Sequence, residues 1–156
     1  MALEKELADL HQTEGALLFS SGYVANEATI STVAKILPGM VLFSDQLNHA
    51  SLISGMISVS SRDTFFLNNL GIKSAGCEKK IFRNNDVDHL HQLMKEYPKD
   101  RPKMVICESV YSMEGSIGPL SKICDVADEH KALTMVDEVS FCHRLSIHQF
   151  SYVLVC

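Results

Sequence analysis

The sequence has few of the features that indicate a nucleic-acid surface, a membrane span or a targeting signal. Its formal net charge is −5, and its basic residues form no run longer than pairs such as Lys79-Lys80. We therefore expect no nucleic-acid partner. No apolar run approaches the length of a transmembrane helix, so no membrane insertion is expected. The first residues have neither the apolar core of a signal peptide nor the arginine-rich character of a transit peptide, so any targeting segment is expected outside this chain.

CxxC spacing is also absent, although the chain contains five cysteines. Two of them fall on predicted core faces, which favours reduced, buried thiols over a disulfide framework or a zinc site. A reducing compartment fits this pattern, and no metal is expected. The length of 156 residues, with 46% hydrophobic and 21% charged residues, is ordinary for one globular domain with a real core.

The stretch from Lys103 to Val139 predicts a strand, a helix and a second strand. Met104 to Cys107 and Leu133 to Val136 are continuous apolar runs, as expected of strands buried on both faces of a parallel sheet. Residues at helical spacing between the two runs predict one apolar helix face: Leu120, Ile123, Cys124 and Ala127. The fold class indicated is therefore α/β, a mostly parallel sheet flanked by helices.

Polar residues follow each of these two strands, at Glu108–Ser112 and at Asp137–Ser140. In open α/β sheets, ligands bind outside the carboxyl ends of the strands. We therefore expect both stretches to line one crevice, and we expect the chemistry of the protein to take place there.

The amino-terminal part predicts an amphipathic helix, a short strand at Ala16–Phe19, and a helix from Val24 to Leu37. Ser20-Ser21-Gly22-Tyr23 lies between the strand and the second helix. Free backbone N–H groups at such a helix start are suited to a phosphate. The turn has no GxGxxG or Walker pattern, so it could equally be a simple connection between the strand and the helix that binds no ligand.

Met40–Phe43 predicts the next strand, followed by a polar stretch that contains His49 and by a helix that runs toward Met56. A single histidine in such a loop is more often solvated than catalytic, although its place at a strand end brings it near the crevice. Residues 58–78 show neither period, and we interpret them as an insertion or a long loop. A short strand at Ile81-Phe82 and a helix from Val87 to Met94 are predicted next.

Several stretches together, in collinear order, resemble the α-oxoamine synthase family: FSDQLNHASLISG, ESVYSMEGSIGPL and LTMVDEV above all. The resemblance implies a pyridoxal-phosphate enzyme of the aspartate-aminotransferase fold type, called fold type I. Residues 1–139 would form an incomplete part of its large, cofactor-binding domain, whereas residues 140–156 have no assignable pattern. The family works as homodimers, with the active site at the subunit interface.

The resemblance also implies an acyltransferase that condenses glycine with succinyl-coenzyme A to give 5-aminolevulinate, coenzyme A and carbon dioxide, the first committed step toward haem. Glycine C-acetyltransferase and 8-amino-7-oxononanoate synthase activities remain alternatives, as does a non-catalytic fragment that pairs with full-length subunits. The expected location is the mitochondrial matrix in a eukaryote and the cytoplasm in a bacterium.

Residue by residue, the resemblance places Gly22 and Tyr23 at the cofactor phosphate, through their backbone N–H groups. His49 would stack on the pyridine ring. Asp137 would hold the pyridinium N–H, because a protonated ring nitrogen lets the ring accept electrons. Ser112 would lie close to the cofactor.

The resemblance assigns Ser44 and Lys79 to the acyl-coenzyme A substrate. The chain departs from the family at Ser140, where the family has a histidine that bonds the cofactor's phenolic oxygen, and the resemblance does not assign this role to His143. The family's Schiff-base lysine lies downstream of the VDEV motif, beyond this sequence. We therefore expect the chain to be inactive by itself.

Overall fold

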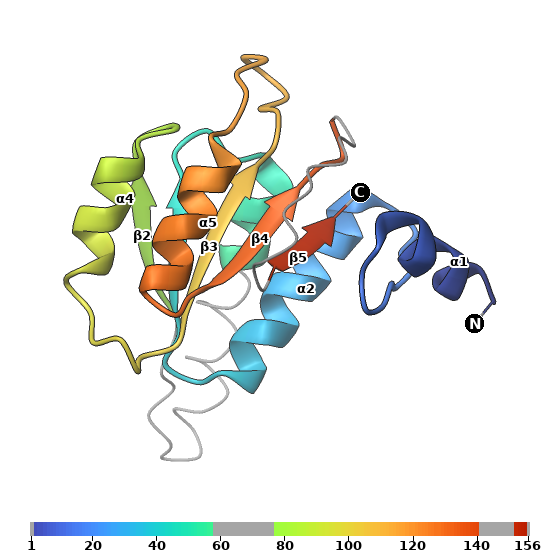
Figure 1. Cartoon of the computed structure of the whole chain (residues 1–156), viewed down its shortest axis with the longest axis horizontal. Coiled ribbons are helices and arrows are strands. Elements are labelled where there is room, and N and C mark those ends of the chain that lie inside the picture. The colour runs from blue at the N-terminus through green and yellow to red at the C-terminus, as the bar shows by residue number, and fades with distance from the viewer. Residues whose placement is uncertain (1, 58–76, 141–151, 156) are drawn as a thin grey trace.

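The computed structural model describes residues 2–57, 77–140 and 152–155. They form a sheet with helices on both faces, and α1 lies to one side of it (Figure 1). The elements are α1 (Ala2–His11), α2 (Gly22–Ile36), β1 (Val41–Asp45), β2 (Glu78–Phe82), α4 (Val87–Met94), β3 (Lys103–Glu108), α5 (Leu120–Glu129), β4 (Leu133–Asp137) and β5 (Tyr152–Val155). A further helical segment covers residues 50–57.

The strand order is β2-β1-β3-β4-β5, and every pairing is parallel. Parallel strands place all their carboxyl ends at one edge of the sheet, which we call the carboxyl edge. Glu108 at the end of β3 stands in register with Asp137 at the end of β4. Asp45 at the end of β1 stands in register with Phe82. The fold class predicted from the sequence, an α/β parallel sheet flanked by helices, is confirmed.

Successive residues of each strand point to opposite faces of the sheet, so the strands supply two cores. On one face, Leu42, Ile106 and Met135 pack with α2 and with the helical segment 50–57. On the other face, Phe43, Val105 and other strand residues pack with α4 and α5. The strands are buried on both faces because helices cover both, which explains their continuous apolar runs. In the part of the chain that the structure describes, no helix combines the length and the apolar character required to cross a membrane.

The region from β3 to β4 follows the sequence pattern closely. The predicted apolar face of α5 is buried, with Ile123 and Cys124 fully inaccessible. Removing an isoleucine-sized side chain from water contributes about 1.5–3 kcal/mol, so a few such residues fix this helix on the sheet. Asp86 caps α4 by accepting the His89 N–H at 2.8 Å.

The strand predicted at Ala16–Phe19 is wrong. These residues form no regular element, and Leu17 is 77% exposed. An apolar run becomes a strand only when a neighbouring strand pairs with it, and none of the described strands borders this segment. The Leu18 N–H instead donates to the Glu4 carboxylate at 3.4 Å.

The short strand predicted at Ile81-Phe82 is confirmed as the end of β2, which begins three residues earlier, and β5 lies where no element was predicted. β2 begins at Glu78, so the last residue of the predicted insertion 58–78 belongs to the sheet, and residues 58–76 lie outside the described residues. β2 is an edge strand that starts with partly exposed charged residues, and for that reason it has no apolar run. β5 pairs with β4 within the stretch 140–156, which had no predicted element.

Candidate active site

Asp137 ends β4 at the carboxyl edge and is 6% exposed. Its Oδ1 accepts the Val139 N–H at 2.9 Å, and its Oδ2 accepts the Asn26 side-chain amide at 2.7 Å. Both donors are neutral, and an ionised carboxylate offers about four acceptor positions. The carboxylate is therefore held in place while it keeps the capacity to accept a hydrogen bond from a ligand.

A chain of polar side chains connects Asp137 to His49. The same Asn26 amide nitrogen lies 2.9 Å from the Ser51 Oγ, which in turn lies 2.8 Å from the His49 Nδ1. The Ser51 backbone N–H also donates to Nδ1, at 3.2 Å. Because Nδ1 accepts from this N–H, these contacts favour the imidazole tautomer with its proton on Nε2. His49 itself is exposed, so the network anchors one nitrogen of a ring that remains open to a ligand.

Glu108 joins the loop after β1 to the loop after β3. It is 2% exposed, and its two carboxylate oxygens accept the backbone N–H groups of His49 and of Ser112, the latter at 3.3 Å. Burial raises the pKa of Glu108, while the two N–H donors oppose that increase. Glu108 therefore positions two of the predicted site residues.

The first turn of α2 supplies free backbone donors beside the loop that follows β4. Ser21 caps the helix, and its hydroxyl accepts the Val24 N–H at 3.3 Å. The N–H groups of Gly22 and Tyr23, in the first turn, have no acceptor within the helix. A Cβ at Gly22 would lie 2.7 Å from Val139 Cγ2, so a larger residue there would displace the Val139 side chain or the helix start.

Glu138 follows Asp137 and is 3% exposed. Burial raises the pKa of its carboxyl group to about 7, whereas the ordinary value is near 4.5. The site thus contains a carboxyl group that changes its protonation near neutral pH, which the sequence pattern did not indicate.

The structure does not bring every predicted residue to this cluster. Ser44 is buried inside β1, where its hydroxyl donates to the Asp45 carbonyl at 3.1 Å and accepts from the Asn48 amide at 2.9 Å. Lys79 is the second residue of β2, in register with Leu42. It therefore lies three residues, or about 10 Å, before the carboxyl edge. The substrate contacts assigned to Ser44 and Lys79 stay predictions.

Asn26 and Ser51 are site residues that the sequence reasoning missed. Asn26 is four residues after Gly22, so it lies one helical turn further along the same face of α2. Ser51 belongs to the NHAS motif that contains His49. Both positions could have been found from these sequence features, but neither spacing shows that the Asn26 amide bonds both Ser51 and Asp137.

Comparisons with known proteins identify the family of the chain. The model of the family described as aminotransferase class I and II matches residues 1–139. A 5-aminolevulinate synthase of Bradyrhizobium diazoefficiens is 47% identical over 88% of this chain and 30% of its own length. The mitochondrial 5-aminolevulinate synthase of Saccharomyces cerevisiae is 49% identical over 88% of this chain and 22% of its own length. The chain thus spans less than a third of the length of these relatives.

Solved structures show the same fold. A serine palmitoyltransferase of Sphingomonas wittichii superposes with a TM-score of 0.72 and 33% identity, over 87% of this chain and 30% of that one. A serine palmitoyltransferase of S. paucimobilis, with a bound PLP–myriocin aldimine, gives a TM-score of 0.70 and 35% identity, over 86% of this chain and 29% of that one. The chain therefore belongs to the aminotransferase class I and II family, whose enzymes depend on pyridoxal phosphate.

Proposed function

We propose that this chain is part of a 5-aminolevulinate synthase, which condenses glycine with succinyl-coenzyme A and releases coenzyme A and carbon dioxide. The names of its relatives in bacteria and fungi support this activity. The structural observation that carries it is the buried Asp137 carboxylate, joined through Asn26 and Ser51 to His49 at the carboxyl edge. A eukaryotic source would place the enzyme in the mitochondrial matrix, and a bacterial source would place it in the cytoplasm.

The residues present fit pyridoxal phosphate. Asp137 would accept the pyridine N–H, for which its buried carboxylate retains free acceptor positions. When bound, the cofactor supplies an electron sink for the carbon that loses its proton or carboxylate. Asn26 and the Val139 N–H keep the carboxylate oriented, so that little reorganisation is required when charge develops on the ring.

His49 would pack its ring on the pyridine. Its Nδ1 contact with Ser51 fixes the orientation of the imidazole, while the exposed ring face stays available. The N–H groups of Gly22 and Tyr23, at the positive end of the α2 dipole, would bind the phosphate group. Ser112, positioned through Glu108, would line the same space from the loop after β3.

The acyl-coenzyme A substrate distinguishes the possible activities within the family. The protein that contains this chain should be assayed with glycine and with succinyl-, acetyl- and pimeloyl-coenzyme A in parallel. We expect the highest kcat/KM with succinyl-coenzyme A. A preference for the acetyl or the pimeloyl thioester would instead identify a glycine C-acetyltransferase or an 8-amino-7-oxononanoate synthase.

The role of Asp137 is tested separately from the choice of substrate. In the same protein, Asp137→Asn removes the charge opposite the ring nitrogen, and it should reduce kcat/KM at least 100-fold with every thioester. Asn26→Ala should reduce it about tenfold, because one of the two donors that orient Asp137 is lost. Asp128→Asn, on the exposed side of α5, makes the same chemical change outside the site and should leave activity unaltered.

A second role, pairing with another subunit, is supported by an exposed apolar surface near the amino terminus. It comprises Leu3, Leu10, Leu17, Leu18, Phe19, Tyr23 and Val24, each between 37% and 77% exposed. Apolar surface of this kind on a soluble domain marks an interaction site. It includes the start of α2, so a partner bound there would lie beside the cofactor phosphate site of a homodimer.

Co-expression of this chain with a tagged full-length subunit tests the pairing. The chain should co-purify with the subunit, and the double substitution Leu17→Ser/Leu18→Ser should abolish co-purification. Ile81→Ser, at an exposed apolar residue of the edge strand β2, serves as the matched control and should have no effect. Co-purification that survives the double substitution would exclude this surface.

A further inference from the structure

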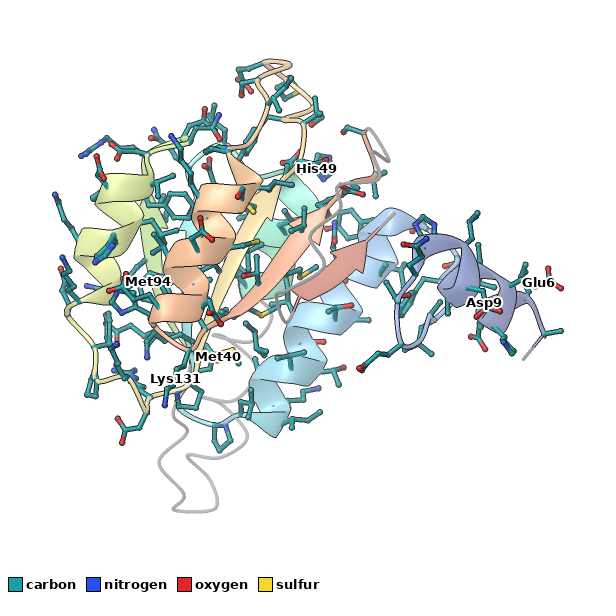
Figure 2. The ribbon with its side chains drawn as sticks, in the orientation of Figure 1. Glu6, Asp9, Met40, His49, Met94 and Lys131 are labelled. Carbon is teal, nitrogen blue, oxygen red and sulfur yellow. The ribbon has the colours of Figure 1, made fainter. Side chains whose placement is uncertain are left out.

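A cluster of three possible metal ligands lies at the end of the sheet opposite the candidate active site. His91 belongs to the last turn of α4, Glu129 ends α5, and His130 is the C-cap of α5. Figure 2 shows His49 at one end of the sheet and Lys131, the residue after His130, at the other. The cluster therefore takes no part in the chemistry proposed above.

The three side chains are close enough to share one cation. One ligand atom from each residue lies within 4.8 Å of the other two. The His91 Nε2 and the Glu129 Oε1 are 3.8 Å apart, and the rings of His91 and His130 meet edge to face with their centroids 5.0 Å apart. Tetrahedral zinc, with bonds of about 2.1 Å, places its ligand atoms about 3.4 Å apart. Small rotations of the exposed Glu129 and the partly exposed His91 side chains would bring the three ligand atoms to this spacing.

Unpartnered buried nitrogens point independently to a ligand. His130 is 4% exposed, and neither of its ring nitrogens has a hydrogen-bond partner among the described residues. The His91 Nε2 is likewise buried and without a hydrogen-bond partner in that part of the chain, and its contact with Glu129 is an ion pair at 3.8 Å. Buried polar atoms in folded proteins are nearly always hydrogen-bonded, so three imidazole nitrogens without a hydrogen bond in one cluster require an explanation.

We propose that His91, Glu129 and His130 form a zinc site, with water in the fourth position. Two imidazoles and a carboxylate are a donor set that zinc prefers. Since the ligands come from the carboxyl ends of two neighbouring helices, the bound ion would tie α4 to α5. Its role would be to stabilise the domain, and it stands independently of the proposed catalytic function.

The surrounding charges bear on the strength of the site. The negative ends of the α4 and α5 dipoles favour a cation at this position. Lys99 and Lys103 oppose it, because both interact electrostatically with His130. The Lys103 ammonium group donates to the backbone carbonyls of Pro98, Lys99 and Arg101, and so it is held in place there. Binding in the micromolar range is therefore expected.

Competition between the purified chain and a chromophoric zinc chelator tests the proposal. One equivalent of zinc should bind, and His91→Gln, His130→Gln and Glu129→Gln should each weaken binding at least tenfold. Cobalt(II) in place of zinc should give the intense visible bands of a low-coordinate site in the wild type alone. His11→Gln in α1 removes a histidine outside the cluster and should change neither result.

Glu129 is exposed, so Glu129→Gln keeps the test valid even if a histidine variant does not fold. Zinc should raise the Tm of the wild-type chain and leave the Tm of Glu129→Gln unchanged. The proposal is overturned if the wild type binds zinc no more tightly than His91→Gln/Glu129→Gln, or if zinc raises the Tm of both proteins equally.

Discussion

Four acidic side chains lie at the carboxyl edge of the sheet, and each has different contacts and therefore a different role. Asp45 accepts the backbone N–H groups of Leu47 and Asn85, so it organises turns. Glu108 bridges two loops, and Asp137 is aimed by Asn26 at the space beside His49. Glu138 is buried, and the pKa of its carboxyl group is raised. The sequence shows four carboxylates, whereas their neighbours in space decide which one can serve a ligand.

At the residue scale, Glu138 predicts a specific dependence of stability on pH. Burial raises its pKa to about 7 in the folded chain, from an ordinary value near 4.5. A carboxyl group with a raised pKa contributes stability that is fully present below pH 4.5 and is lost as the pH rises through 7. The wild type should therefore lose on the order of 2–3 kcal/mol between pH 4.5 and 8 through this group.

Urea denaturation at pH 5 and at pH 8 measures this effect. Glu138→Gln should reduce the difference between the two free energies of unfolding by that amount, because glutamine does not titrate. Glu14→Gln removes an exposed carboxylate of the same type and serves as the control. An unchanged difference in Glu138→Gln would show that the carboxyl group ionises normally in the folded chain.

At the scale of elements, the start of α2 decides whether a phosphate can be bound. The helix start lies so close to the loop after β4 that a Cβ at residue 22 would meet the Val139 side chain, and the helix start or that side chain would then have to move. The prediction therefore concerns Gly22 and the side chain that it faces, Val139.

Gly22→Ala should weaken pyridoxal phosphate binding to the protein that contains this chain at least tenfold, as measured by absorbance titration. Adding Val139→Ala to this variant removes the atoms that the new Cβ meets and should restore most of the affinity. Gly15→Ala is the control, because a Cβ there meets nothing within 4 Å. A double variant as weak as Gly22→Ala would mean that the clash is not the cause.

The elements also differ in how far their sequences predict them. β3, α5 and β4 are buried on the faces that their patterns indicate, so local period and final environment agree. Ala16–Phe19 has the apolar pattern of a strand but no partner among the described strands. Glu78–Lys80 is charged, and yet it forms part of β2 and pairs with β1. In both cases hydrogen bonding to a neighbouring strand, or its absence, decided the outcome against local composition.

For the whole chain, the prediction is that its 156 residues alone give no synthase turnover. Asp137, His49 and Gly22 are positioned, but the described part of the chain joins no lysine to their hydrogen-bond network. Lys79 and Lys103 lie in the amino halves of their strands, and Lys122 lies on the exposed side of α5. With no lysine of the described residues joined to this network to form a covalent link, and with each charged hydrogen bond worth roughly 1.5–3 kcal/mol, we expect pyridoxal phosphate to bind this chain orders of magnitude more weakly than it binds an enzyme that forms the link.

Borohydride reduction in the presence of pyridoxal phosphate, followed by peptide mapping, tests this prediction. We expect scattered labelling of surface lysines below one equivalent. Stoichiometric labelling of a single lysine, together with 5-aminolevulinate formed from glycine and succinyl-coenzyme A, would contradict it.

The sequence by itself determined the α/β class, the order of the central elements and the placement of His49 and Asp137 at strand ends, because these follow from local hydrophobic period and from the geometry of parallel sheets. Only the tertiary structure decided that Asn26 and Ser51 connect them, that Glu108 bridges two loops, and that Ser44 and Lys79 lie apart from the cluster. Such contacts join residues as far apart in the chain as Asn26 and Asp137. No local pattern encodes them, because they arise only when packing on both faces of the sheet fixes where each side chain lies.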